Sequence, residues 1–130
     1  MALPLGAALA AFLAAGAAPD ATGPNAPAAQ QQMQVPLIAP QALKGLMASQ
    51  RIALIDVREP SEFAAGHIDG AVLVPLGMLG AEYAKLPKDV PLVVYCRAGN
   101  RSAKAVAFLI AHGYSRAVSL AGGYLAFSGQ

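Results

Sequence analysis

The chain has 130 residues, of which 56% are apolar and 12% are charged, and its formal net charge is +2. This length suits one domain, and the small net charge together with the absence of Trp argues against a nucleic-acid-binding surface. A single cysteine excludes an internal disulfide and a cysteine-based zinc site.

Residues 1–36 differ in composition from the rest of the chain. The alanine-rich run 1–19 has the length and the small-residue ending of a secretory signal, although no Lys or Arg precedes it. We interpret 1–19 as a signal peptide or hydrophobic anchor, and 20–36, rich in Pro, Ala and Gln, as a flexible linker. Export to the periplasm or tethering to a membrane is therefore expected, with a cytoplasmic location as the alternative.

From residue 37 onward, short apolar runs alternate with amphipathic stretches. Helices are predicted over 40–49, 60–66, 79–87 and from near 102 to 113. Strands are predicted over 51–58, 71–76, 91–96 and 117–123. Continuously apolar strands that alternate with helices are typical of an open, mostly parallel sheet with helices on both faces. The predicted fold class is therefore α/β, with residues 37–130 as one domain.

The stretch CRAGNRS, residues 96–102, lies between the third predicted strand and the helix that follows it. In open α/β sheets, ligands bind beyond the carboxyl ends of the strands. Gly99 and Asn100 are residue types that readily take the left-handed conformation, which can turn successive N–H groups inward. Together with the positive end of the helix, this loop is predicted to hold a negative charge.

Cys96 is a candidate nucleophile in this loop. Arg97, Arg101 and Lys104 follow it closely, and no acidic residue occurs from there to the end of the sequence. Such surroundings favour the thiolate, which is the nucleophilic form. Because the loop holds no His, Asp or Glu to act as acid or base, the reaction should release a stable anion. Sulfur transfer from thiosulfate meets this need, since sulfite leaves and a persulfide remains.

Three motifs together resemble one family. CRAGNRS after an apolar strand resembles the active-site loop of rhodanese-type sulfurtransferases. IDVREPSEFAAGHIDGAVLVPL, residues 55–76, looks like the upstream signature of that family. LAGGYLAF, residues 120–127, resembles its C-terminal motif, with Phe127 where Trp is common. The resemblance covers residues 37 to the end, and it implies the rhodanese-like fold, a small open parallel sheet flanked by helices.

The resemblance also implies roles for individual residues. Cys96 would be the catalytic residue that carries sulfur. The residues expected to bind the anionic donor, through the two arginine side chains and the backbone N–H groups, are Arg97, Ala98, Gly99, Asn100, Arg101 and Ser102.

Four further residues are expected to support the site structurally: Asp56, Arg58, Glu62 and His67. Arg58 and Glu62 are predicted to form an internal ion pair that shapes the loop. His67 is interpreted as a structural residue that fixes the turn into the next strand.

The predicted function is transfer of sulfane sulfur from a small anionic donor, thiosulfate or a persulfide, to a thiol, with cyanide as the acceptor in an assay. No metal and no organic cofactor are expected, and a sulfur-relay protein is a candidate partner. A sulfur-carrier or regulatory rhodanese module is the alternative. A cysteine phosphatase or arsenate reductase is a weaker one, because phosphatase loops place five residues between Cys and Arg, whereas four separate Cys96 from Arg101.

Overall fold

The computed structural model describes residues 35–49 and 51–129. The signal or anchor predicted for 1–19 and nearly all of the linker predicted for 20–36 lie outside these residues. Within the described ranges, no helix is both long enough and apolar enough to cross a membrane.

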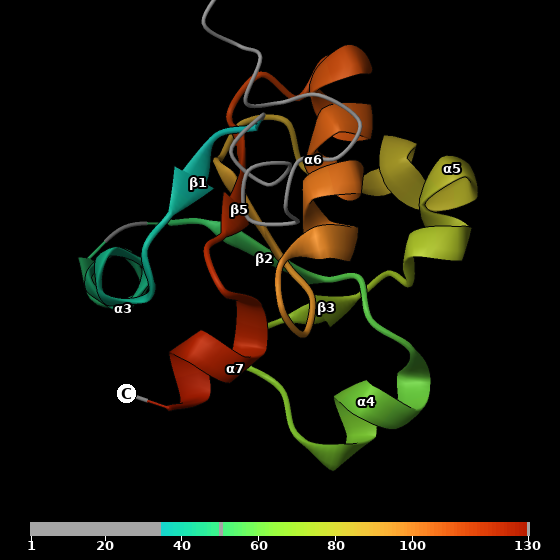
Figure 1. Ribbon diagram of the computed structural model, residues 1–130. Coiled ribbons are helices and arrows are strands. Elements are labelled where there is room, and N and C mark those ends of the chain that lie inside the picture. The colour runs from blue at the N-terminus through green and yellow to red at the C-terminus, as the bar shows by residue number, and fades with distance from the viewer. Residues whose placement is uncertain (1–34, 50, 130) are drawn as a thin grey trace, which may run out of the picture.

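A five-stranded sheet forms the centre of the domain (Figure 1). Its strand order is β1-β5-β4-β2-β3, and all neighbouring strands are parallel. The strands are β1 (Leu37–Ile38), β2 (Ala53–Asp56), β3 (Val72–Leu73), β4 (Leu92–Tyr95) and β5 (Ala117–Leu120). The helices are α3 (Pro40–Ser49), α4 (Pro60–Ala65), α5 (Leu79–Glu82), α6 (Asn100–Ala111) and α7 (Gly123–Ser128).

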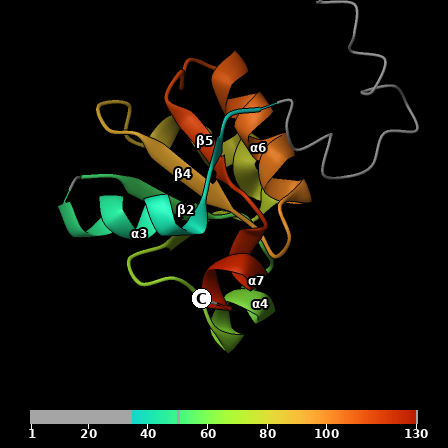
Figure 2. The same ribbon diagram turned by 60° about the vertical axis from the view of Figure 1, so that its left-hand side comes forward.

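The sheet has a hydrophobic core on each face because side chains alternate along its strands. Ile55 and Val94 pack on one face with residues of α5 and α6, such as Leu109. Leu54 and Val93, one position earlier in each strand, pack on the other face, where α3 and α7 lie. Figure 2 shows α3 and α6 on opposite sides of the sheet. This confirms the predicted α/β fold with helices on both faces.

Several elements differ from the prediction in length or in kind. The helix predicted over 79–87 is divided into α5 and a 3₁₀ turn, η3 (Tyr83–Lys85), and another 3₁₀ turn, η2 (Leu76–Met78), directly precedes it. Gly77 and Gly80, both poor helix formers, fall in this stretch. The two-residue strand β1 and the helix α7 were not predicted: β1 is too short to show a pattern, and two glycines directly precede the body of α7.

The carboxyl ends of β2, β4 and β5 meet at one edge of the sheet. Asp56, the last residue of β2, is in register with Tyr95, the last residue of β4. Parallel strands bring their following loops together in this way. The loop at Cys96, the segment before α4 and the start of α7 therefore lie side by side, and they build the site described next (Figure 1).

Candidate active site

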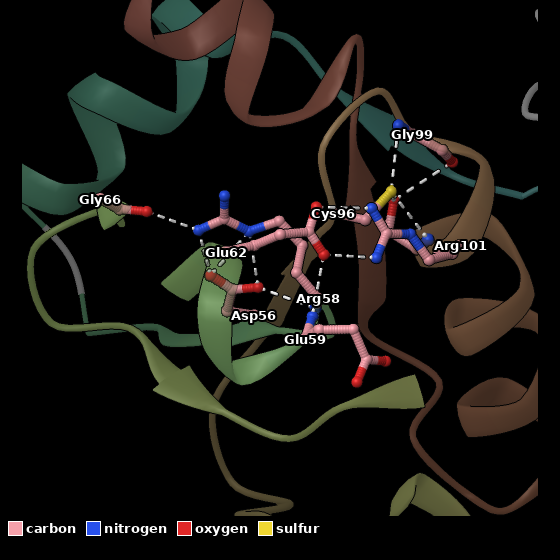
Figure 3. A network of polar contacts seen from close by, with 9 residues as sticks. Asp56, Arg58, Glu59, Glu62, Gly66, Cys96, Gly99 and Arg101 are labelled. Atoms are coloured by element: carbon pink, nitrogen blue, oxygen red, sulfur yellow. Dashed lines mark hydrogen bonds and ion pairs between the residues drawn. The ribbon is translucent and has the colours of Figure 1, made fainter. Parts of the chain in front are cut away.

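The sulfur of Cys96 is buried at the start of the loop that joins β4 to α6. The residue is 1% exposed, and its Sγ accepts hydrogen bonds from the backbone N–H groups of Gly99, at 3.1 Å, and Ser102, at 3.3 Å. Figure 3 shows the sulfur inside the turn of the loop, with the N–H of Gly99 pointing toward it. Backbone donors aimed at sulfur stabilise a negative charge on it without any titratable partner.

One glycine accounts for the turn of this loop. Gly99 has a φ of 114° and is the N-cap of α6. This left-handed conformation is costly for residues with a Cβ atom. Asn100, the second residue expected to be left-handed, is instead the first residue of α6, and no described residue other than glycine has a positive φ. The prediction for Asn100 was wrong because the helix begins two residues earlier than expected.

The start of α7 holds the other side of the same loop. The backbone N–H of Tyr124 donates to the carbonyl of Cys96, at 2.8 Å, and the N–H of Leu125 donates to that of Arg97, at 3.1 Å. Gly123 permits this approach, since a methyl group there would lie 2.7 Å from the Cys96 carbonyl oxygen. The motif LAGGYLAF contains these residues, but the sequence did not reveal that they bind the loop.

Arg101 forms a two-pronged ion pair with Glu62 of α4. Its Nη1 lies 2.8 Å from Oε1 and its Nη2 lies 3.0 Å from Oε2. Figure 3 shows the two side chains facing each other. The N–H of Glu59 also donates to Oε1, at 3.0 Å. The hydrogen bonds from Arg101, followed by the one from Glu59, lower the pKa of Glu62 to about 2. The predicted pair between Arg58 and Glu62 is therefore wrong: the partner of Glu62 is Arg101.

Arg58 instead pairs with Asp56, and both residues are buried. The shortest contact joins Nη2 to Oδ2 at 2.7 Å, and the same nitrogen donates to the carbonyl of Gly66 at 2.7 Å. The guanidinium lies over the ring of Tyr124, 4.6 Å from its centre. The hydrogen bond with Asp56 raises the pKa of Arg58. This group links the end of β2 to the end of α4 and to α7.

Arg97, unlike Arg101, has no carboxylate partner among the described residues. Its side chain is exposed, and among the described residues it makes no hydrogen bond and no ion pair. It lines an open pocket of about 240 Å³ together with Glu62, Tyr124 and Leu125. The two arginines expected to bind a donor therefore differ: Arg101 is already neutralised by a carboxylate, whereas Arg97 remains available to an external anion.

His67 lies outside the loop and contacts α4. Its Nδ1 is 2.9 Å from the carbonyl oxygen of Phe63, and the two rings stack with their centres 3.7 Å apart. In the part of the chain that the structure describes, no three His, Cys, Asp or Glu side chains are grouped so as to hold a metal ion.

Comparisons with known proteins agree with one another. The model of the family described as rhodanese-like domain matches residues 39–130. A probable adenylyltransferase/sulfurtransferase of Mycobacterium tuberculosis is 46% identical over 96 residues, which are 72% of this chain but only 24% of that protein. The thiosulfate sulfurtransferase GlpE of Pseudomonas aeruginosa is 37% identical over 87 residues, or 67% of this chain and 78% of that protein. The solved structure of a human single-domain sulfurtransferase is similar with a TM-score of 0.67 and 29% identity, covering 73% of this chain and 96% of that one.

Proposed function

This chain belongs to the rhodanese-like domain family, and we propose that it is a sulfurtransferase that carries sulfane sulfur on Cys96. One observation carries the proposal: the buried Sγ of Cys96 accepts hydrogen bonds from the backbone N–H groups of Gly99 and Ser102. These donors suit a sulfur atom that is a thiolate before loading and becomes a thiolate again on discharge.

The first half of the proposed reaction loads the cysteine. The Cys96 thiolate attacks the outer sulfur of thiosulfate, so that a new S–S bond forms while the bond to the sulfonate sulfur breaks. Sulfite leaves with the electron pair of the broken bond, and Cys96 is left as a persulfide anion. No proton is transferred, which agrees with a loop that holds no side-chain acid or base.

The second half returns the cysteine to its starting state. An acceptor thiolate, or cyanide in an assay, attacks the outer sulfur of the persulfide. The bond between Sγ and the outer sulfur breaks, and Sγ takes the electron pair as a thiolate. The product is a new persulfide, or thiocyanate when cyanide is the acceptor.

We assign Arg97, rather than Arg101, as the side chain that binds the sulfonate of the donor. Arg97 is exposed at a pocket beside the loop, whereas both terminal nitrogens of Arg101 are bound to Glu62. The name of the Pseudomonas relative, a thiosulfate sulfurtransferase, supports thiosulfate as the donor. The same pocket is large enough for an acceptor thiol bulkier than thiosulfate.

Phosphate ester hydrolysis fits these residues less well. A phosphatase needs an acid to protonate the leaving oxygen. Glu62 is the carboxyl group bound to the loop, but its pKa of about 2 leaves it unprotonated at neutral pH. The site therefore suits a leaving group that departs as a stable anion, such as sulfite.

Mass spectrometry of the intact protein tests the proposal. Incubation with thiosulfate should add the mass of one sulfur atom, and cyanide should remove it with release of thiocyanate. The Cys96→Ser variant should show no added mass. Wild-type protein that gains no sulfur, or a variant that still gains it, would overturn the proposed function.

A further inference from the structure

A second buried hydroxyl lies behind the loop serine. Ser119 is in β5, a strand flanked on both sides by neighbours in the sheet, and it is completely buried. Its Oγ lies 2.8 Å from the Oγ of Ser102, which is also completely buried. Burying a hydroxyl without a partner is costly, so this pair of hydroxyls satisfies a group that the apolar core would otherwise disfavour.

The surroundings of Ser102 decide which hydroxyl donates. The Oγ of Ser102 lies 3.2 Å from the carbonyl oxygen of Gly99 and 3.5 Å from the Sγ of Cys96. The Ser102 hydroxyl donates to the carbonyl of Gly99 and accepts from the thiol of Cys96. A sulfur anion has no proton to donate, so the Ser102 hydroxyl can then turn its own proton toward Sγ. Among the described residues, the Ser119 hydroxyl has its hydrogen-bond partner in the Ser102 hydroxyl alone. Both hydroxyls have a hydrogen-bond acceptor when Ser119 donates to the Oγ of Ser102, and Ser102 donates to the carbonyl of Gly99 or to the sulfur anion.

We propose, on the basis of the proposed function, that Ser119 is a positioning residue that acts on the Cys96 sulfur through Ser102. The hydrogen bond from Ser119 polarises the Ser102 hydroxyl and leaves its proton free for sulfur. Ser119 touches neither substrate nor the reacting atoms. Its effect is greatest when Sγ carries a full negative charge.

Loading and discharge of Cys96 should depend differently on the hydrogen bond that Ser119 donates to Ser102. In discharge, cyanide forms a bond to the outer sulfur, the S–S bond breaks, and Sγ leaves with the electron pair, so weaker stabilisation of the thiolate slows the step directly. In loading, the same thiolate is the nucleophile. A less stabilised thiolate is scarcer but more nucleophilic, and the two effects partly cancel. Ser119 therefore acts mainly on discharge.

Single-turnover kinetics on the full chain can test this. Protein is loaded with thiosulfate, freed of excess donor and mixed with cyanide, and thiocyanate release is followed; loading is followed separately by intact mass. For Ser119→Ala we expect discharge to slow about fivefold, the scale of one hydrogen bond. Loading should change less than about twofold. Ser119→Thr keeps the hydroxyl and should restore the ratio of the two rates.

The outcomes separate this inference from the function on which it rests. Wild-type protein that takes up no sulfur contradicts the proposed function. Wild-type protein that turns over while Ser119→Ala shows unchanged rates, or an equal slowing of both halves, contradicts only the role of Ser119. A Ser119→Thr variant with the same altered ratio as Ser119→Ala would also overturn it, because the hydroxyl would then have no part in the effect.

Discussion

The Glu62 carboxylate and the Arg101 guanidinium are joined by two parallel hydrogen bonds although they lie 39 positions apart in the chain. This pair connects α4 to the first turn of α6, directly beside the loop that holds Cys96 (Figure 3). Arg101 is thereby neutralised within the protein. In the part of the chain that the structure describes, this leaves Arg97 as the loop arginine without an ion-pair partner.

The Glu62–Arg101 pair should make stability depend on pH in the acidic range. The pKa of Glu62 is lowered from 4.5 to about 2 in the folded protein. A lowered carboxyl pKa stabilises the folded state fully above the unfolded value, and this stabilisation is lost as pH falls through the folded value. The gap in unfolding free energy between wild type and Glu62→Gln should therefore be constant above about pH 5 and shrink toward pH 2.

Urea unfolding from neutral pH downward measures that gap. A suitable control is Glu82→Gln, because Glu82 pairs with the exposed Lys85 and this change should cost less than about 1 kcal/mol. If the difference in unfolding free energy between wild type and Glu62→Gln did not vary with pH, the lowered pKa of Glu62 would be contradicted.

Arg97→Ala should weaken the use of thiosulfate without loosening the fold. The side chain is exposed and carries a charge that no described residue neutralises. We expect KM for thiosulfate to rise about tenfold, which corresponds to about 1.4 kcal/mol of lost binding. Reaction of Cys96 with a neutral alkylating reagent should stay within about twofold of wild type, since the hydrogen bonds to Sγ come from Gly99 and Ser102 and not from the Arg97 side chain.

A matched control is Arg116→Ala, which removes an exposed cation just before β5, at the opposite edge of the sheet from the loop. It should leave KM unchanged. If Arg97→Ala slowed alkylation as much as thiosulfate turnover, the arginine would act on the thiolate and not on the donor.

Gly123→Ala should disturb both stability and loading. Gly123 has a φ of 64°, and an added methyl group would overlap the backbone of Arg97. We expect a loss of about 2 kcal/mol or more from the strained backbone alone, together with slower sulfur uptake because the loop must shift. Gly45→Ala is the matched control: it lies in α3 with open space around it, and the change should stabilise the protein by about 0.5–1 kcal/mol. Thermal and urea unfolding measure the stability of both variants. Equal changes in stability for Gly123→Ala and Gly45→Ala would contradict the proposed clash at Gly123.

Asp56→Ala should be the most destabilising of these changes. It leaves the Arg58 guanidinium buried without its carboxylate, and loss of one partner of a buried pair costs about 3–5 kcal/mol. The double variant Asp56→Ala with Arg58→Met removes both charges and should be more stable than Asp56→Ala alone. Equilibrium unfolding compares the two, and a double variant that is less stable than the single one would mean that the pair does not act through an uncompensated charge.

The sequence predicted the position of Cys96 because that position depends on local pattern. An apolar run must end where Gly99 and polar residues begin, and the parallel fold places such an end at the binding edge of the sheet. The positions of Arg97 and Arg101 beside Cys96 were predicted for the same reason, since they follow the same strand. What their side chains contact depends on packing between distant segments.

The ion pairs of Arg58 and Glu62 show why side-chain contacts between distant segments could not be predicted. Arg58 and Glu62 are four residues apart, a spacing that brings side chains together on a helix, but α4 begins only at Pro60. Arg58 therefore lies before the helix and turns toward Asp56, while Glu62 reaches Arg101. Ser119 gave no signal at all, since one serine in an apolar strand has no pattern, and its contact with Ser102 exists only in the folded sheet.

The contact between α7 and the loop also bears on the order in which the domain is made. The N–H groups that hold the carbonyls of Cys96 and Arg97 belong to Tyr124 and Leu125, which are synthesised well after the cysteine. A nascent chain that has completed β5 already carries its thiol, but one wall of the loop is still missing. If Cys96 carries sulfur as proposed, a chain that stops after β5 would hold the cysteine but lack the hydrogen bonds that fix its loop.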